Sequence, residues 1–212
     1  MVIKYLLCFH LCFFLFKGTS GITHNQLNLP HGLARDLNTN TLFIADYLNS
    51  RIMMYRKNTS TGILVGGNLT TGISETQLFY PQGIFYDQFT NSILIANTDA
   101  KNVVRWTLNA SQWSIVAGNS SGFSGNSSSL LNDPTDVMLD PMNNMYIVDR
   151  LNQRIQFFVA GQTSATTIIG VNGQSGANAQ LLNLPSSVAL DNQLNLYVSD
   201  AKNHRIQKFL RY

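Results

Sequence analysis

The chain has 212 residues and a formal net charge of +3, and only 12% of its residues are charged. Runs of lysine and arginine interleaved with aromatic residues do not occur, so we expect no nucleic-acid partner. Both cysteines, Cys8 and Cys12, lie near the N-terminus. The rest of the chain therefore has no disulfides, no cysteine-based catalysis and no thiolate metal site.

The N-terminal segment is typical of a secretory signal peptide. Lys4 precedes an apolar run over residues 5–16, and Lys17 and small residues up to Ser20 follow it. This run is shorter than the roughly 20 residues of a membrane helix. We predict a signal peptide over residues 1–20, a secreted protein, and no membrane association after cleavage. An uncleaved anchor or a buried strand is the alternative. Removing Lys4 and Lys17 leaves 12 Lys and Arg against 11 Asp and Glu, a net charge of +1.

Residues 21–212 contain an internal repeat. A proline is followed six residues later by an aspartate four times, and successive prolines are 51, 53 and 51 residues apart: Pro30/Asp36, Pro81/Asp87, Pro134/Asp140 and Pro185/Asp191. Each pair encloses a short apolar strand, because proline suits the start of a strand and aspartate suits the turn after it. The units run over about 29–79, 80–132, 133–183 and 184–212. We expect each aspartate to cap its own turn rather than to bind calcium.

A second strand and a tight hairpin turn follow in every unit. In three units the aspartate that ends this strand precedes an asparagine by three residues and an arginine by five, which predicts three ion pairs: Asp46–Arg51, Asp149–Arg154 and Asp200–Arg205. Each ion pair would link the two strands of its hairpin, and we call it the staple of the hairpin. Unit two departs from the pattern. There Asn97 or Asp99 takes the place of the aspartate and Val103 or Val104 that of the arginine, so we expect its staple to be absent.

Third and fourth strands complete the unit, as in Arg154–Phe158 and Thr167–Ile169. No sustained helical periodicity appears after the N-terminal segment, so nothing supplies the crossover helices of a parallel sheet. We predict an all-β chain in which each unit is one four-stranded antiparallel blade of a β-propeller. A set of β-sandwich hairpins is the alternative.

The units resemble the NHL-repeat propellers, whose repeats carry a Pro-x-Gly-Val-Ala-Val-Asp strand, a Leu-Tyr-Val-Ala-Asp strand and an Asn-His-Arg turn. Residues 196–209, Leu-Tyr-Val-Ser-Asp-Ala-Lys-Asn-His-Arg-Ile-Gln-Lys-Phe, match these motifs best, and the resemblance covers about 29–211. It implies a propeller, usually of about six blades, that serves as an interaction platform.

The number of units leaves the predicted propeller incomplete, at about 3.75 blades. The fourth unit ends after its third strand, and the segment before Pro30 supplies no fourth strand. We expect a truncated piece of a longer propeller; an open arc or an oligomeric ring is the alternative. Unclosed blade edges would favour self-association.

Five Asn-x-Ser/Thr sequons agree with export and predict N-glycosylation: Asn58, Asn68, Asn109, Asn119 and Asn126. They lie in or beside polar segments after third and fourth strands. The two last ones lie in a loop rich in glycine and serine, 118–129.

Histidine is too sparse to predict a metal centre. Beyond the signal segment the chain has only His24, His31 and His204, and His31 has no histidine at the equivalent position of another unit. Zinc needs three or four ligands, so we expect no metal site and no cofactor. Propellers related by fold include an amidating lyase and lactonase-like hydrolases. The rival prediction is therefore a metal-dependent lyase or hydrolase whose remaining ligands lie in blades that this chain lacks.

We predict a secreted, non-catalytic module that binds a protein or glycan through loops at one face of the propeller. Residues that recur in every unit are explained by folding, so the candidate contacts are residues specific to one unit. These candidates are His31, Arg35, Tyr47, Gln82, Tyr86 and Arg150.

Overall fold

The computed structural model describes residues 18–211. The apolar run 5–16 and both cysteines, on which the predicted signal peptide rests, lie outside these residues. Within the described part of the chain, no helix is long and apolar enough to cross a membrane.

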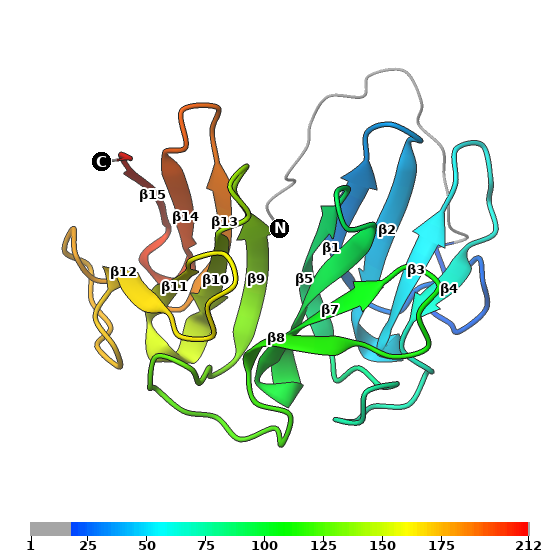
Figure 1. The fold of residues 1–212 in the computed structure, drawn as a ribbon, viewed down its shortest axis with the longest axis horizontal. Helices are drawn as coiled ribbons and strands as arrows, with labels where there is room; N and C mark the ends of the chain where they lie inside the picture. The colour runs from blue at the N-terminus through cyan, green and yellow to red at the C-terminus, as the bar shows by residue number, and fades with distance from the viewer. Residues whose placement is uncertain (1–17, 212) are drawn as a thin grey trace.

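The described chain is all-β, as predicted, and consists of four antiparallel sheets (Figure 1). The first sheet contains β1 (Pro30–Asp36), β2 (Thr41–Asp46), β3 (Arg51–Tyr55) and β4 (Ile63–Gly66), and the second contains β5 (Pro81–Asp87), β6 (Ser92–Asn97), β7 (Asn102–Thr107) and β8 (Ser114–Gly118). The third contains β9 (Pro134–Leu139), β10 (Met145–Asp149), β11 (Arg154–Phe158) and β12 (Thr166–Gly170), and the fourth contains β13 (Pro185–Leu190), β14 (Leu196–Asp200) and β15 (Arg205–Phe209). We call these sheets blades 1 to 4, since each is one blade of a β-propeller.

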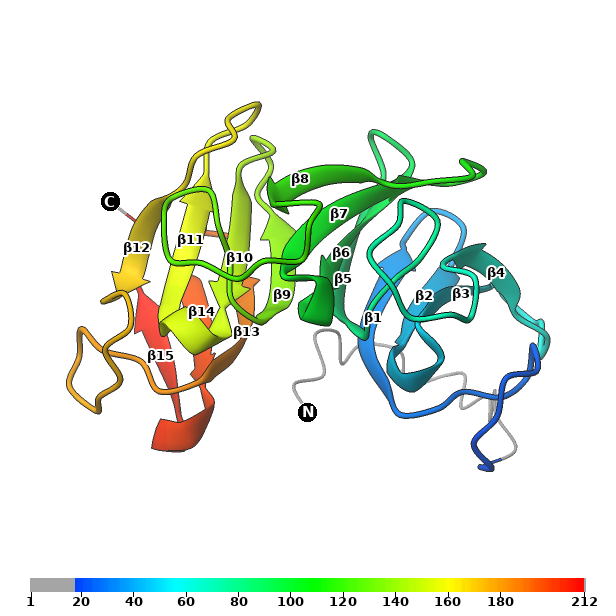
Figure 2. The same cartoon turned by 90° about the horizontal axis from the view of Figure 1, so that it is seen from below.

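The blades follow one another along an arc, with blades 1 and 4 at its two ends (Figure 2). Their innermost strands pack in the order β1, β5, β9 and β13. Short 3₁₀ turns join the second and third strands of each blade: η1 (Tyr47–Asn49), η2 (Thr98–Ala100), η3 (Arg150–Asn152) and η4 (Ala201–Asn203). Each turn ends at a residue in the left-handed conformation, which the tight reversal requires.

Apolar side chains fill the spaces between neighbouring blades. One core joins Phe43 and Ile52 of blade 1 to Ile95 and Trp106 of blade 2. Two further cores join blade 2 to blade 3 and blade 3 to blade 4. Successive residues of a strand point to opposite faces of the sheet. A blade that lies between two other blades therefore has apolar side chains on both of its faces. Stacking of the repeats therefore supplies the core.

The ion pairs of blades 1, 3 and 4 are present. Arginine Nε lies 2.6 Å from the carboxylate in the pair Asp46–Arg51 and 2.8 Å in Asp149–Arg154 and Asp200–Arg205. Each arginine also donates to backbone carbonyls of the loop that leads into its own blade. Arg154, for example, donates to the carbonyls of residues 126, 127 and 130. The pair thus joins the hairpin to the preceding loop.

Blade 2 differs from the prediction for this position. Asn97 ends β6 and pairs in register with Asn102, so Asn102, and not Val103 or Val104, takes the place of the arginine. Asn97 Nδ2 donates to Asn102 Oδ1 over 3.2 Å, and Asn102 Nδ2 donates to a loop carbonyl over 2.9 Å. Val103 and Val104 are fully buried in the cores. Asn97 thus takes the place of the aspartate, as one of the two predicted alternatives, and a neutral amide pair stands where the other blades have an ion pair. The assignment of Val103 or Val104 was wrong because the turn has the same length as in the other blades.

The aspartates after the first strands cap their own turns, as expected. Asp36 accepts a hydrogen bond from the Asn38 backbone nitrogen (2.9 Å), and Asp87, Asp140 and Asp191 accept the equivalent bond at 3.0, 2.8 and 2.9 Å. The hydrogen bond from the Thr39 hydroxyl lowers the pKa of the Asp36 carboxyl. Turn formation therefore accounts for these four residues.

Blade 4 has three strands in the described part of the chain, and β15 forms its outer edge. In the other blades the third strand pairs with a fourth, and its second residue is fully buried, as Ile52 and Ile155 are. The equivalent Ile206 of β15 is 60% exposed. This edge presents unpaired backbone groups beside an apolar side chain.

Candidate functional site

The 3₁₀ turn of each blade lies against the start of the next blade. The Thr98 hydroxyl donates to the Pro134 carbonyl (2.8 Å), and the Leu184 backbone nitrogen donates to Gln153 Oε1 (2.7 Å). The residue before each repeated proline is left-handed, with φ between 48° and 60°. This geometry brings side chains from the turn of one blade beside side chains at the start of the next.

Aromatic rings form a row across the boundary between blades 1 and 2. His31 at the start of β1 lies 4.6 Å from the ring centroid of Tyr47 in η1. Tyr47 stacks on Tyr80, the residue before β5, with centroids 4.9 Å apart and planes 24° apart. Phe79 lies beside Tyr80, with ring centroids 5.3 Å apart. His31 is exposed and the tyrosines are half-buried. Partial burial lowers the pKa of the His31 imidazole below its ordinary value.

Charged side chains gather at the next boundary, between blades 2 and 3. Asp133, the residue before β9, accepts a hydrogen bond from Arg150 over 2.8 Å and lies 3.6 Å from Lys101 Nζ. The same lysine lies 3.4 Å from Asp99 of η2. Asp133 is 12% exposed, whereas Asp99 and Arg150 are about one third exposed. The cluster balances two acids against two bases.

Tyr47 belongs to both groups. Burial raises the pKa of its phenol, and the charges of Asp99 and Asp133 raise it further, while Arg150 acts in the opposite direction. Charges from two other blades are therefore close enough to act on this hydroxyl, which stays protonated at neutral pH. We call the whole set the Tyr47 site; it consists of His31, Tyr47, Tyr80, Asp99, Lys101, Asp133 and Arg150.

The side chains of the Tyr47 site suit recognition of a polar ligand. Carboxylates accept hydrogen bonds, the guanidinium, the ammonium and the phenol donate them, and the rings offer flat apolar contact. Within residues 18–211, no group of three or more histidine, cysteine, aspartate or glutamate side chains is placed to hold a metal ion.

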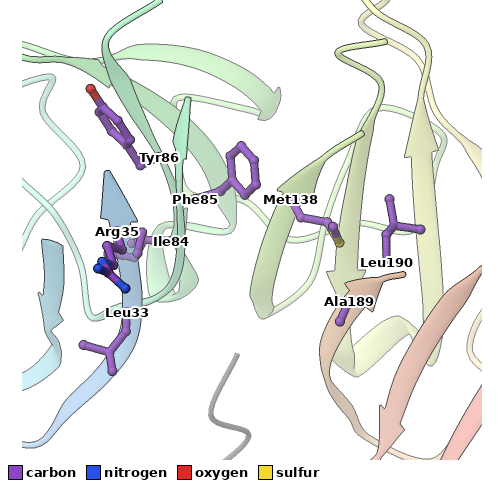
Figure 3. Close-up of a pocket in the computed structure, with 9 residues that line it drawn as sticks. Leu33, Arg35, Ile84, Phe85, Tyr86, Met138, Ala189 and Leu190 are labelled. Carbon is purple, nitrogen blue, oxygen red and sulfur yellow. The ribbon is translucent and has the colours of Figure 1, made fainter. Parts of the chain in front are cut away.

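The six candidate residues fall into three sets: three belong to the Tyr47 site, two line a cavity, and one lies at a contact between blades. His31, Tyr47 and Arg150 belong to the Tyr47 site. Arg35 and Tyr86 instead line a cavity between the innermost strands (Figure 3). Tyr86 also stacks on Phe43, with centroids 4.8 Å apart, and donates to Asn91 Oδ1 over 2.9 Å.

The sixth candidate, Gln82, is half-buried on β5, where its carbonyl oxygen closely approaches Gly32 of β1. A Cβ atom on Gly32 would lie 2.2 Å from that oxygen. Gly32 therefore lets the innermost strands of blades 1 and 2 come together. The structure thus places Gln82 at a contact between blades 1 and 2.

Sequence reasoning missed four members of the Tyr47 site: Tyr80, Asp99, Lys101 and Asp133. Tyr80 and Asp133 precede the repeated proline, where the other units have Leu29 and Leu184. That contrast was a usable signal. Asp99 and Lys101 were not identified as candidates because the turn of unit two was aligned incorrectly.

Residues 182–209 match the family model of the NHL repeat. This segment comprises the whole of blade 4, and the same strands, turn and ion pair recur in blades 1 and 3. The chain is a β-propeller whose fourth blade matches the NHL repeat.

Solved structures share this propeller fold. An auxiliary nutrient binding protein from Bacteroides ovatus is 16% identical with a TM-score of 0.63; the alignment covers 86% of this chain and 48% of that one. A gluconolactonase from Xanthomonas campestris is 15% identical with a TM-score of 0.66, covering 89% and 60%. A streptogramin B lyase is 9% identical with a TM-score of 0.61, covering 86% and 51%.

This chain therefore spans about half the length of these structures. Such low identities establish a common fold and leave the activity of this chain open. A comparison with curated protein sequences found no match.

Proposed function

We propose that this NHL propeller is a secreted, non-catalytic module that binds a glycan or protein ligand through the Tyr47 site. The observation that carries the proposal is the convergence on one partly exposed tyrosine of aromatic rings and of charges from two other blades. The residues equivalent to Tyr47 are Thr98, Arg150 and Ala201, so the fold itself does not require a tyrosine there. A unit-specific cluster of this kind favours recognition over scaffolding.

The chemistry of the site favours a neutral ligand rich in hydroxyl or amide groups. Asp99 and Asp133 balance Lys101 and Arg150, so the site has little net charge to attract an ion. Directional donors and acceptors beside aromatic rings suit the hydroxyls of a saccharide or the backbone of a peptide. The test must therefore include both ligand classes.

Two features of the sequence support a secreted setting. The apolar run 5–16 has the length of a signal-peptide core. Four of the five sequon asparagines, Asn58, Asn68, Asn109 and Asn126, are exposed on loops. Asn119 is half-buried and donates to the Phe123 carbonyl over 3.2 Å, so we expect it to be the poorest glycan acceptor.

The experiment titrates the purified secreted chain with a panel of defined oligosaccharides and synthetic peptides, followed by saturation-transfer NMR. For any ligand that binds, we expect Tyr47→Phe to weaken binding about tenfold by removing one hydrogen bond. Arg150→Ala should weaken it by at least as much. Tyr197→Phe is the matched control, because Tyr197 donates to Asp191 on blade 4, away from the site. Binding that survives both site substitutions would refute the assignment.

The rival activity, a metal-dependent lyase or hydrolase, remains a prediction with its own test. Propellers of this fold include a nutrient binding protein as well as a gluconolactonase and a lyase, so the fold does not choose between binding and catalysis. Elemental analysis of the purified protein would separate the two. Stoichiometric zinc or calcium, with a melting temperature that falls in chelator, would favour the enzyme.

A further inference from the structure

A cavity of about 110 Å³ lies between the innermost strands of the four blades. Its walls include Leu33 and Arg35 of β1, Phe85 of β5, Met138 of β9, and Ala189 and Leu190 of β13. Figure 3 shows the residues of blades 1 and 2 on one side of the cavity and those of blades 3 and 4 on the other. We call it the axial cavity. It shares no residue with the Tyr47 site.

The walls of the axial cavity are about half apolar and half polar. Leu33 is 47% exposed, and Phe85, Met138 and Leu190 are half-buried although each also contacts a core between blades. An apolar group that entered the cavity would remove these surfaces from water, with a gain of about 25 cal/mol per Å². The apolar half of the wall thus suits an alkyl group, and the polar half leaves room for a polar group on the same ligand.

Arg35 gives the axial cavity a charged wall. Its guanidinium is half-buried and donates to the side-chain oxygen of Asn40. Among the described residues, no carboxylate lies within ion-pair distance of Arg35. Five other arginines do pair with an aspartate: Arg51, Arg105, Arg150, Arg154 and Arg205.

Nearby carboxylates are held by other partners. Asp36 accepts hydrogen bonds within its own turn, and Asp87 is paired with Arg105 at 2.8 Å. Tyr86 donates to Asn91. A half-buried guanidinium without a counter-ion favours binding of an anion, and a carboxylate matches its fork of donors.

We propose that the axial cavity binds a small branched aliphatic carboxylate. The alkyl group lies against Leu33, Phe85, Met138 and Leu190, and the carboxylate pairs with Arg35. The axial cavity is partly open to solvent, so its volume limits only the alkyl group that enters it. For comparison, an engineered, closed apolar cavity of about 150 Å³ holds benzene. A cavity of about 110 Å³ accommodates a branched alkyl group smaller than that ring.

The test titrates the purified chain with isovalerate and, separately, with isovaleramide, by calorimetry and ligand-observed NMR. The two probes have the same alkyl group, but only the acid carries a charge. We expect saturable binding of isovalerate, and binding of the amide weaker by about tenfold or more. Arg35→Gln should weaken the binding of isovalerate by a similar factor. Arg56→Gln is the matched control, since Arg56 is exposed and does not line the cavity.

Ala189→Leu provides a second route that leaves Arg35 intact. The larger leucine side chain would fill the cavity and abolish binding of both probes. Circular dichroism would verify that the variant folds. Absence of saturable isovalerate binding at millimolar concentrations would overturn the proposal, as would equal affinity for acid and amide. Binding by Ala189→Leu at wild-type affinity would place the ligand elsewhere. Tyr47→Phe should leave isovalerate binding unchanged. The test of the axial cavity is therefore independent of the test of the Tyr47 site, and one proposal can fail while the other holds.

Discussion

The ion pair of blade 3 allows a quantitative test of what holds a blade together. Asp149 is fully buried, and it accepts hydrogen bonds from Arg154 (2.8 Å), Asn152 (2.9 Å) and the backbone nitrogen of Asn132 (2.7 Å). Burial raises the pKa of its carboxyl, which shows how strongly the site disfavours an uncompensated charge. Arg154→Asn would leave this carboxylate buried without its counter-ion.

We expect Arg154→Asn to lower the free energy of unfolding by about 3–5 kcal/mol, the usual cost of breaking a buried ion pair on one side. That is a large share of the roughly 5–15 kcal/mol that stabilises a typical domain. The double variant Asp149→Asn/Arg154→Asn reproduces the amide pair Asn97–Asn102 of blade 2. It should recover at least about 2 kcal/mol of that loss, since no charge remains buried.

The assay is urea unfolding followed by far-ultraviolet circular dichroism, with the exposed arginine of Arg56→Ala as the control. Because repeat proteins can unfold in steps, the midpoint and the slope are both compared. A loss below about 1 kcal/mol for Arg154→Asn would refute the reasoning, since the ion pair would then add little. A double variant no more stable than the single one would show that the three lost carbonyl contacts, rather than the unpaired charge, cause the destabilisation.

Three further predictions concern other parts of the fold. Ile206→Lys, at the edge strand β15, should reduce concentration-dependent self-association in analytical ultracentrifugation, and unchanged association would exclude this edge as the contact. The pKa of Asp36 lies below its ordinary value, so its stabilising contribution is present above about pH 4 and is lost as the pH falls through the folded-state pKa. Acid titration of Asp36→Asn should therefore show a weaker fall in melting temperature than wild type, and parallel curves would contradict the assignment. Gly170→Ala should lower the free energy of unfolding by about 2 kcal/mol or more, measured by thermal unfolding. Gly170 has φ of +82°, and a Cβ atom there would lie 2.1 Å from the Gln153 carbonyl oxygen. A near-neutral result would mean that the strand shifts to make room for the methyl group.

Much of the scaffold could be predicted because its determinants are local. Proline at the start of a strand, aspartate in the turn after it, and aspartate and arginine five residues apart are all explained by contacts within one blade. The error in blade 2 has the same origin. Asn102 lacks the charge that marked the other hairpins, so the pattern was shifted onto Val103 and Val104, although the turn kept its length.

The candidate site could be predicted only in part. His31, Tyr47 and Arg150 stood out as residues specific to one unit, but nothing in their spacing indicated that they meet across blades. Arg35 and Tyr86 stood out for the same reason and lie instead at the axial cavity. Unit-specific sequence identifies residues that the repeat does not need, but it does not say which of them share a surface.

The sequence by itself determined the repeat, the all-β class and the residues that close each turn, because these depend on contacts within about ten residues along the chain. Only the tertiary structure decided which side chains converge. The turn of one blade lies against the start of the next, so Tyr47 meets Tyr80, and Lys101 meets Asp133, across about 30 residues of intervening chain. Likewise, the curvature of the arc places Leu33 and Leu190 around one cavity. Packing between blades sets these distances, and no local pattern records them.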